Sequence, residues 1–179
     1  MAQELIISGF GGQGVMSMGQ LLTYAGMLEG KNVSWLPSYG PEMRGGTAYC
    51  SVIITEEMVG SPIVNEATAV IAMNLPSMER FERTVNPGGL LIVNSSLVNK
   101  KADRTDIDVC YVPANEIADE LGNTRVANMV ILGAFLQKTR AVSEDSIIES
   151  LKGVLGSSKE HLIPLNREAL KRGTQSVNP

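Results

Sequence analysis

The stretch Leu5-Ile6-Ile7-Ser8-Gly9-Phe10-Gly11-Gly12-Gln13-Gly14-Val15 decides the fold. Its apolar run stops abruptly at a glycine, which is typical of a strand buried on both faces in a parallel sheet. Residues 15–29 then place apolar side chains at the helical period, and Gly30 is a natural C-terminal cap for that helix. A second apolar run over residues 32–36 predicts another strand, so residues 4–36 are expected to form a β-loop-α-β unit.

The rest of the chain continues the alternation of strands and helices. Strands are predicted at residues 47–55, 69–73, 90–94 and 107–112, with a turn at residues 86–89. Helices are predicted at residues 76–85, at 125–136, from Ser143 onward and at 165–171. This order indicates an α/β fold, namely a Rossmann-like three-layer domain with a mostly parallel sheet and a helical C-terminal part. No repeat or linker interrupts the chain, so residues 1–179 are expected to form a single domain.

Composition excludes several classes of partner. The chain has 179 residues, 19 acidic against 15 basic side chains, and only 4% aromatic residues. Nucleic acid is therefore not expected as a partner, because the chain has neither a basic field nor many stacking surfaces. No run reaches the ~18 apolar residues of a membrane span, and no signal peptide precedes the first strand. We therefore expect a cytoplasmic protein with no membrane partner.

The cysteines and the histidine offer little catalytic chemistry. Cys50 and Cys110 are far apart in sequence, so the chain alone cannot build a four-thiolate iron–sulfur or zinc site. Both are expected to be reduced and buried. His161 is the only imidazole, which excludes multi-histidine metal sites and disfavours a Ser-His-Asp triad. No metal ligand and no catalytic residue is predicted.

The glycine-rich stretch at residues 9–14 fits the pattern G-x-G-x-x-G between a strand and a helix. Glycines let the backbone approach a ligand, and free N–H groups at a helix start favour a negative group. The alternative is that these glycines only let the first helix pack closely on the sheet. The candidate cofactor-binding residues of this loop are Gly9, Gly11, Gly12, Gln13 and Gly14.

Two common nucleotide chemistries do not fit this loop. A dinucleotide site requires an acidic residue near the end of the second strand, but residues 33–37 contain none. A P-loop requires a lysine, but Gly14 is followed by Val15-Met16-Ser17. An NAD or FAD enzyme and a nucleotide hydrolase are therefore disfavoured.

A second unusual segment spans residues 38–47, Ser-Tyr-Gly-Pro-Glu-Met-Arg-Gly-Gly-Thr. If the β-loop-α-β unit forms, this segment lies at the same end of the sheet as the glycine loop. Its Tyr39, Glu42 and Arg44 either form a ligand or partner surface, or are an ordinary turn with an ion pair in water. Such an ion pair adds at most about 1 kcal/mol. The residues alone leave both interpretations open.

The sequences at 9–15 and 38–48 resemble the two hallmark motifs of a known family, the gamma subunits of 2-oxoacid:ferredoxin oxidoreductases. Residues 125–130 with Gly133-Ala134, and residues 166–169 with Gly173, also resemble this pyruvate/ketoisovalerate oxidoreductase gamma domain. The resemblance covers nearly the whole chain. One departure is Leu170, where relatives often carry an aromatic residue.

The resemblance implies an enzyme complex that oxidatively decarboxylates a 2-oxoacid to an acyl-CoA and passes electrons to ferredoxin. Its thiamine diphosphate, magnesium and 4Fe–4S clusters are then expected in partner subunits called alpha, beta and delta. This chain has neither a Gly-Asp-Gly motif nor cluster cysteines, so the isolated chain is expected to be inactive. The motifs are most similar to the 2-oxoglutarate and branched-chain types.

The roles that remain for this chain are subunit assembly and a part in binding coenzyme A. We expect the N–H groups of residues 11–14 to receive the diphosphate of coenzyme A, with Arg125 and Asn128 as further donors. The alternative is that Arg125 and Asn128 only cap the helix end and form hydrogen bonds with polar groups of the core. Tyr39, Glu42 and Arg44 are assigned to a subunit interface. The isolated chain is expected to form a homodimer through exposed apolar surface.

Two other classes of protein remain as alternatives. One is a free-standing Rossmann-like nucleotide-binding dehydrogenase, and the other is a pure assembly scaffold whose loop binds nothing. The sequence does not identify the oxoacid.

Overall fold

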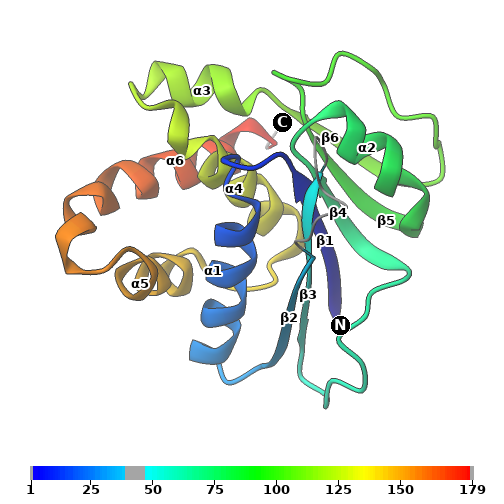
Figure 1. The fold of residues 1–179 in the computed structure, drawn as a ribbon, viewed down its shortest axis with the longest axis horizontal. Coiled ribbons are helices and arrows are strands. Elements are labelled where there is room, and N and C mark those ends of the chain that lie inside the picture. The colour runs from blue at the N-terminus through cyan, green and yellow to red at the C-terminus, as the bar shows by residue number, and fades with distance from the viewer. Residues whose placement is uncertain (1, 39–46, 178–179) are drawn as a thin grey trace.

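The computed structural model describes residues 2–38 and 47–177, which form a six-stranded sheet flanked by helices (Figure 1). The strand order is β2-β3-β1-β4-β5-β6. Strands β1, β4, β5 and β6 pair in parallel, whereas β3 is antiparallel to both β1 and β2. The strands are β1 (Gln3–Gly9), β2 (Asn32–Ser38), β3 (Ala48–Thr55), β4 (Ala67–Ala72), β5 (Val85–Asn94) and β6 (Asp108–Val112).

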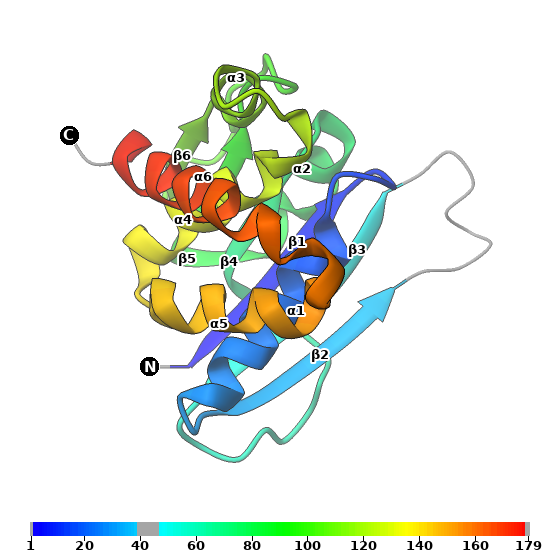
Figure 2. The same ribbon diagram turned by 90° about the vertical axis from the view of Figure 1, so that its left-hand side faces the viewer.

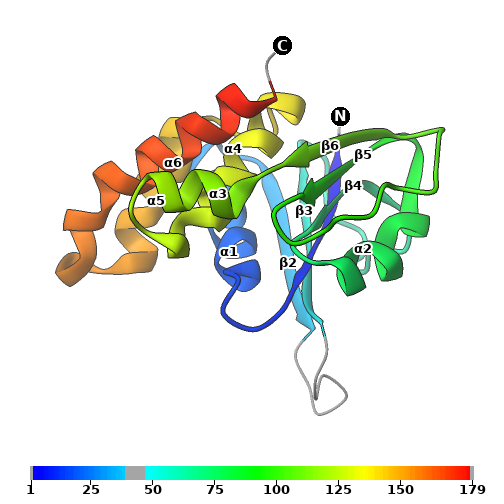
Figure 3. The same ribbon diagram turned by 90° about the horizontal axis from the view of Figure 1, so that it is seen from above.

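Helices cover both faces of the sheet, which confirms the predicted three-layer α/β fold. Figure 3 shows α2 alone on one side and the other α-helices on the opposite side. The α-helices are α1 (Val15–Leu28), α2 (Leu75–Phe81), α3 (Ala114–Glu120), α4 (Ala127–Thr139), α5 (Glu144–Leu155) and α6 (Ile163–Ser176). The short 3-10 helices of the described residues are η2 (Glu82–Thr84), η3 (Thr124–Val126) and η4 (Ser157–Leu162).

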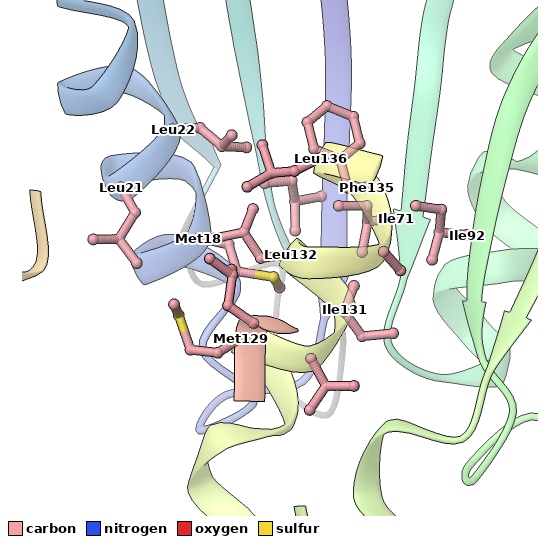
Figure 4. Packing of buried hydrophobic residues seen from close by; sticks show 14 of the residues in the cluster. Met18, Leu21, Leu22, Ile71, Ile92, Met129, Ile131, Leu132, Phe135 and Leu136 are labelled. Atoms are coloured by element: carbon pink, nitrogen blue, oxygen red, sulfur yellow. The ribbon is translucent and has the colours of Figure 1, made fainter. Parts of the chain in front are cut away.

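The larger hydrophobic core lies between the sheet, α1 and α4 (Figure 4). Met18 and Leu22 of α1 and Phe135 of α4 pack against Ile71 and Ile92 of the central strands, and all five side chains are fully buried. Burying a side chain of this size contributes about 1.5–3 kcal/mol. Helix α4 is apolar on nearly every side because α6 packs along its outer surface, as Figure 2 shows. The core thus fixes the start of α4 relative to the sheet.

The predicted β-loop-α-β unit forms, but its two strands are not neighbours. Strand β3 lies between them, with Ala48 paired to Gly9 of β1 and Tyr49 paired to Ser38 of β2. Such pairing between distant segments has no local signal in the sequence. The described residues on either side of the segment 39–46 therefore lie at the end of the sheet where β1 ends.

Other boundaries differ from the sequence predictions. The turn predicted at residues 86–89 is wrong, because these residues continue β5 through an irregularity at which the register against β4 shifts. Helix α3 was not predicted, and α6 extends beyond the predicted range 165–171. Helix α3 is short and follows Pro113 directly, so its apolar period is hard to recognise.

The prediction that both cysteines are reduced and buried is confirmed. Cys50 and Cys110 are both free and buried, and His161 is exposed in η4. Within residues 2–38 and 47–177, no helix combines the length and the apolar character that a bilayer crossing needs.

Candidate functional site

The loop between β1 and α1 is shaped by glycines with left-handed backbones. Gly12 has φ of 88° and Gly14 has φ of 75°, and L side chains rarely adopt either conformation. Gly14 is the N-cap of α1 and has no side chain with which to accept a hydrogen bond from the first turn of that helix. The N–H groups of the first turn thus have no side-chain cap among the described residues, as an anion site at a helix start requires.

Gly9 and Gly14 of the loop also allow close packing. A Cβ atom at Gly9 would lie 2.7 Å from the Gln13 Oε1 atom and 2.9 Å from the Met73 Cβ atom. A Cβ atom at Gly14 would overlap the side-chain amide of Asn128. Gly11 is exposed and has open space around it. The packing interpretation therefore describes Gly9 and Gly14 well, whereas Gly11 and Gly12 are free to face a ligand.

Gln13 closes the loop on itself. Its backbone N–H donates to the Phe10 carbonyl at 3.2 Å, and its side-chain Oε1 atom accepts from the Phe10 N–H at 2.6 Å. The same Oε1 atom accepts from the Asn74 Nδ2 group at 3.0 Å. Asn74 in turn caps α2, since its side chain accepts from the Ser77 N–H. The Gln13 oxygen is thus engaged with the protein, and its amide nitrogen is left for a ligand.

A cavity of about 170 Å³ lies between this loop and the start of α4. The cavity brings together four of the predicted binding residues, Gly12, Gln13, Arg125 and Asn128, with Asn115 from the start of α3. Met73, Thr124 and Ala127 complete its wall. Figure 1 shows the loop after β1 beside the start of α4. The cavity lies beyond the carboxyl ends of the parallel strands, where open α/β sheets bind their ligands.

Among the described residues, the wall of this cavity carries one charged side chain, the exposed guanidinium of Arg125, and no carboxylate. Four other surface hollows are larger, from 380 to 540 Å³, but each has at least one acidic residue in its wall. Each of those walls carries acidic side chains beside its basic ones, whereas the small cavity presents the Arg125 charge without a carboxylate among the described residues, which favours an anion here. We therefore take the small cavity as the candidate site.

Sequence reasoning missed three asparagines that lie in or under this cavity: Asn74, Asn94 and Asn115. Each follows or ends one of the successive parallel strands β4, β5 and β6. That regularity is visible in the sequence, but it gains meaning only when the parallel order of the strands is known. The predicted interface residues Tyr39, Glu42 and Arg44 lie outside the described residues.

Together the sheet, the glycine loop and the cavity define a Rossmann-like α/β domain with its site at the carboxyl ends of the strands. The chain belongs to the pyruvate ferredoxin/flavodoxin oxidoreductase family, whose sequence model matches residues 4–176.

Named relatives agree with this membership. The chain is 39% identical over 170 residues to the ketoisovalerate oxidoreductase subunit VorA of Methanothermobacter thermautotrophicus, covering 94% of this chain and 35% of that protein. It thus spans about a third of the length of the VorA proteins. It is 32% identical to the 2-oxoglutarate synthase subunit KorC of Methanothermobacter marburgensis, covering 97% of this chain and 99% of that one.

Solved structures share the fold. The gamma subunit of a keto/oxoacid ferredoxin oxidoreductase from Geobacter sulfurreducens superposes with a TM-score of 0.83, at 28% identity and with 97% of each chain covered. A 2-oxoglutarate:ferredoxin oxidoreductase from Magnetococcus marinus, solved with 2-oxoglutarate, coenzyme A and succinyl-CoA bound, has a TM-score of 0.87 at 23% identity. That match covers 98% of this chain and 31% of the other, and it shows the fold alone.

Proposed function

We propose that this chain is the gamma-type subunit of a 2-oxoacid:ferredoxin oxidoreductase, which oxidatively decarboxylates a 2-oxoacid to an acyl-CoA. The family membership supports this proposal, as do relatives named for ketoisovalerate and 2-oxoglutarate. The relative KorC has nearly the same length as this chain, which favours a separate small subunit.

The redox chemistry is proposed to reside in partner chains. Thiamine diphosphate, when bound, supplies the electron sink for decarboxylation, and 4Fe–4S clusters carry single electrons to ferredoxin. The two cysteines of this chain cannot hold a cluster, so alpha, beta and delta subunits would bring these groups and magnesium. The proposed complex is cytoplasmic.

The part proposed for this chain in coenzyme A binding is carried by one observation, the donor-lined cavity without a carboxylate. Gly12 and the first turn of α1 offer N–H groups, and Arg125 and Asn128 add side-chain donors beside them. A diphosphate accepts hydrogen bonds and donates none, so this donor set fits it. Coenzyme A is the first ligand to test because the Magnetococcus marinus enzyme of this fold was solved with it.

The volume suggests that the cavity holds only part of the ligand. Pockets that enclose a whole cofactor or drug-sized ligand measure about 300–1,000 Å³, whereas this cavity measures about 170 Å³. We therefore propose that the diphosphate sits here and that partner chains cover the rest. Tyr39, Glu42 and Arg44 are proposed for that interface, because the described residues on either side of the segment 39–46 lie at the end of the sheet where β1 ends.

Purification of the complex from its native source tests the proposal. We expect the chain to co-purify with larger subunits and the preparation to reduce viologen only when a 2-oxoacid and coenzyme A are both present. Purification of the chain alone with bound NAD(H) would instead favour the dehydrogenase. An active complex to which coenzyme A binds equally well after the cavity is altered would favour the scaffold.

A further inference from the structure

Three carboxamide side chains line the cavity, and a protein donor occupies the oxygen of each one. The Gln13 Oε1 atom accepts from the Phe10 N–H and from the Asn74 Nδ2 group. The Asn115 Oδ1 atom accepts from the Asn94 Nδ2 group at 2.8 Å. The Asn128 Oδ1 atom accepts from the Met129 N–H at 2.9 Å.

This pattern determines what the cavity offers a ligand. A carboxamide has an accepting side and a donating side, so fixing its oxygen on the protein leaves its NH₂ group available. The three carboxamides, the Arg125 guanidinium and Gly12 line the wall together, so groups that can donate outnumber the acceptor that the Thr124 hydroxyl adds. A group that must donate a hydrogen bond, such as the amino edge of adenine, finds no side-chain carboxylate here to accept it.

Two of the fixing donors come from asparagines that are themselves buried. Asn94 at the end of β5 is fully buried, and Asn74 is 3% exposed. Asn94 also donates to the Met73 carbonyl at 3.4 Å, so its amide group is held between β4 and α3. Neither side chain lines the cavity itself.

Asparagine at position 94 destabilises the folded state, and its contacts within the protein do not offset that destabilisation. Its Oδ1 atom is buried and has no hydrogen-bond partner among the described residues. A buried polar atom without a partner destabilises the folded state, and a leucine of the same shape would avoid that penalty. The presence of asparagine here is explained if its donor group is needed to orient Asn115.

We propose that Asn94 and Asn74 are positioning residues that turn the three carboxamides of the cavity into hydrogen-bond donors, which makes the site selective for a phosphoryl group such as one half of a diphosphate. This inference rests on the proposed function, since it refines how the same cavity would hold coenzyme A. Asn94 acts through Asn115, and Asn74 acts through Gln13. Asn115 is thereby assigned as a ligand-contacting residue.

The test uses the full chain and inorganic pyrophosphate as the probe, with affinity measured by isothermal titration and stability by thermal unfolding. The key variant is Asn94→Leu, which keeps the shape but removes the donor. Asn115→Ala and the double variant complete a mutant cycle. Asn166→Leu is the matched control, because Asn166 is also a buried asparagine whose amide donates to a carbonyl, that of Leu162.

The proposal predicts that Asn94→Leu weakens pyrophosphate binding about tenfold, the effect of losing one hydrogen bond to a charged group. Its unfolding temperature should be unchanged or higher, a result that a merely structural asparagine would not give. In the Asn115→Ala background, Asn94→Leu should have no further effect, because the two residues act in series. Asn166→Leu should bind as the wild type does.

Asn74→Ser provides a second variant that does not depend on the folding of Asn94→Leu. Serine is a good N-cap and can still accept from the Ser77 N–H, but it is too short to reach Gln13. We expect weaker pyrophosphate binding with α2 intact. Wild-type affinity in both Asn94→Leu and Asn74→Ser would overturn this inference while leaving the proposed function standing. No binding of pyrophosphate by the wild-type chain would overturn this inference and the proposed diphosphate site, while the membership of the oxidoreductase family would stand.

Discussion

Gly133 of α4 lies in direct contact with the backbone of Leu170 in α6, so closely that a Cβ atom would overlap the Leu170 carbonyl oxygen. The contact is reciprocal, because a Cβ atom at Gly173 of α6 would overlap the Val130 carbonyl oxygen of α4. Two helices can approach this closely only where glycine removes the side chain. These two glycine contacts fix α4 against the outer helix α6. They thereby also fix the end of the cavity that Arg125 and Asn128 line.

The first prediction concerns this helix contact. We expect Gly133→Ala to lower the free energy of unfolding by about 1–3 kcal/mol, because the added methyl group must push two backbones apart. Urea denaturation measures the change. Gly153→Ala is the control, since Gly153 is in α5 with no atom near its Cβ position. It should instead stabilise the protein by about 0.5–1 kcal/mol through its higher helix propensity. Equal effects of both substitutions would contradict the close-contact explanation.

Much of the fold could be predicted because its signals are local. The apolar run that ends at Gly9, the capping Ser143 and the buried helix α4 all appear where the sequence places them. The insertion of β3 between β1 and β2 could not be predicted, since it depends on pairing between distant segments such as Gly9 with Ala48. Whether residues 1–179 act as one domain stays a prediction.

The candidate site was predicted only in part, because some of its residues carry a signal in the local sequence and others do not. Gly12 and Gln13 belong to a compact motif, and Arg125 and Asn128 were selected through the family resemblance. The positioning residue Asn94 could not be singled out, because its importance depends on its contact with Asn115, which lies 21 residues further along the chain in α3. Their binding roles remain predictions for the experiments described above.

A second prediction concerns the pH dependence of stability. Burial alone would raise the pKa of Glu29, but hydrogen bonds from the Ser143 N–H and from Lys31 outweigh it and lower that pKa from 4.5 to about 2. A depressed pKa stabilises the fold above the unfolded value, and this contribution is lost as pH falls from 4.5 toward 2. Glu29→Gln should therefore lose about 1–2 kcal/mol at neutral pH and nothing near pH 2.

Denaturant midpoints for wild type and Glu29→Gln across this pH range measure the effect. Glu57→Gln is the control because Glu57 is exposed. A difference between wild type and Glu29→Gln that is constant with pH would show that the carboxylate charge is not responsible.

A third prediction concerns the thiols. Burial raises the pKa of Cys50 to about 12, and burial with the neighbouring Asp108 charge raises that of Cys110. Since only the thiolate reacts, iodoacetamide at about pH 8 should leave both cysteines unmodified in the folded chain. Both should react quickly in urea. Mass spectrometry counts the adducts, and rapid labelling of the native chain would contradict the buried positions.

A fourth prediction separates the glycines of the loop. Gly14→Ala forces a side chain into a left-handed backbone and against Asn128, so we expect a loss of about 1–3 kcal/mol. Gly11→Ala has free space and an ordinary backbone, and its stability should stay within about 0.5 kcal/mol of wild type. Thermal unfolding compares the two, and a large loss for Gly11→Ala would mean that the loop packs differently.

The most direct test of the central claim is isothermal titration of the assembled complex with coenzyme A, comparing wild type with Gly12→Asp. Gly88→Asp is the matched control, since Gly88 also has a positive φ and open space but lies in β5, away from the cavity. A carboxylate at the cavity should repel the diphosphate and weaken binding at least about tenfold, whereas the control should bind as the wild type does. Unchanged affinity of an intact Gly12→Asp complex would contradict the claim that this cavity receives the diphosphate.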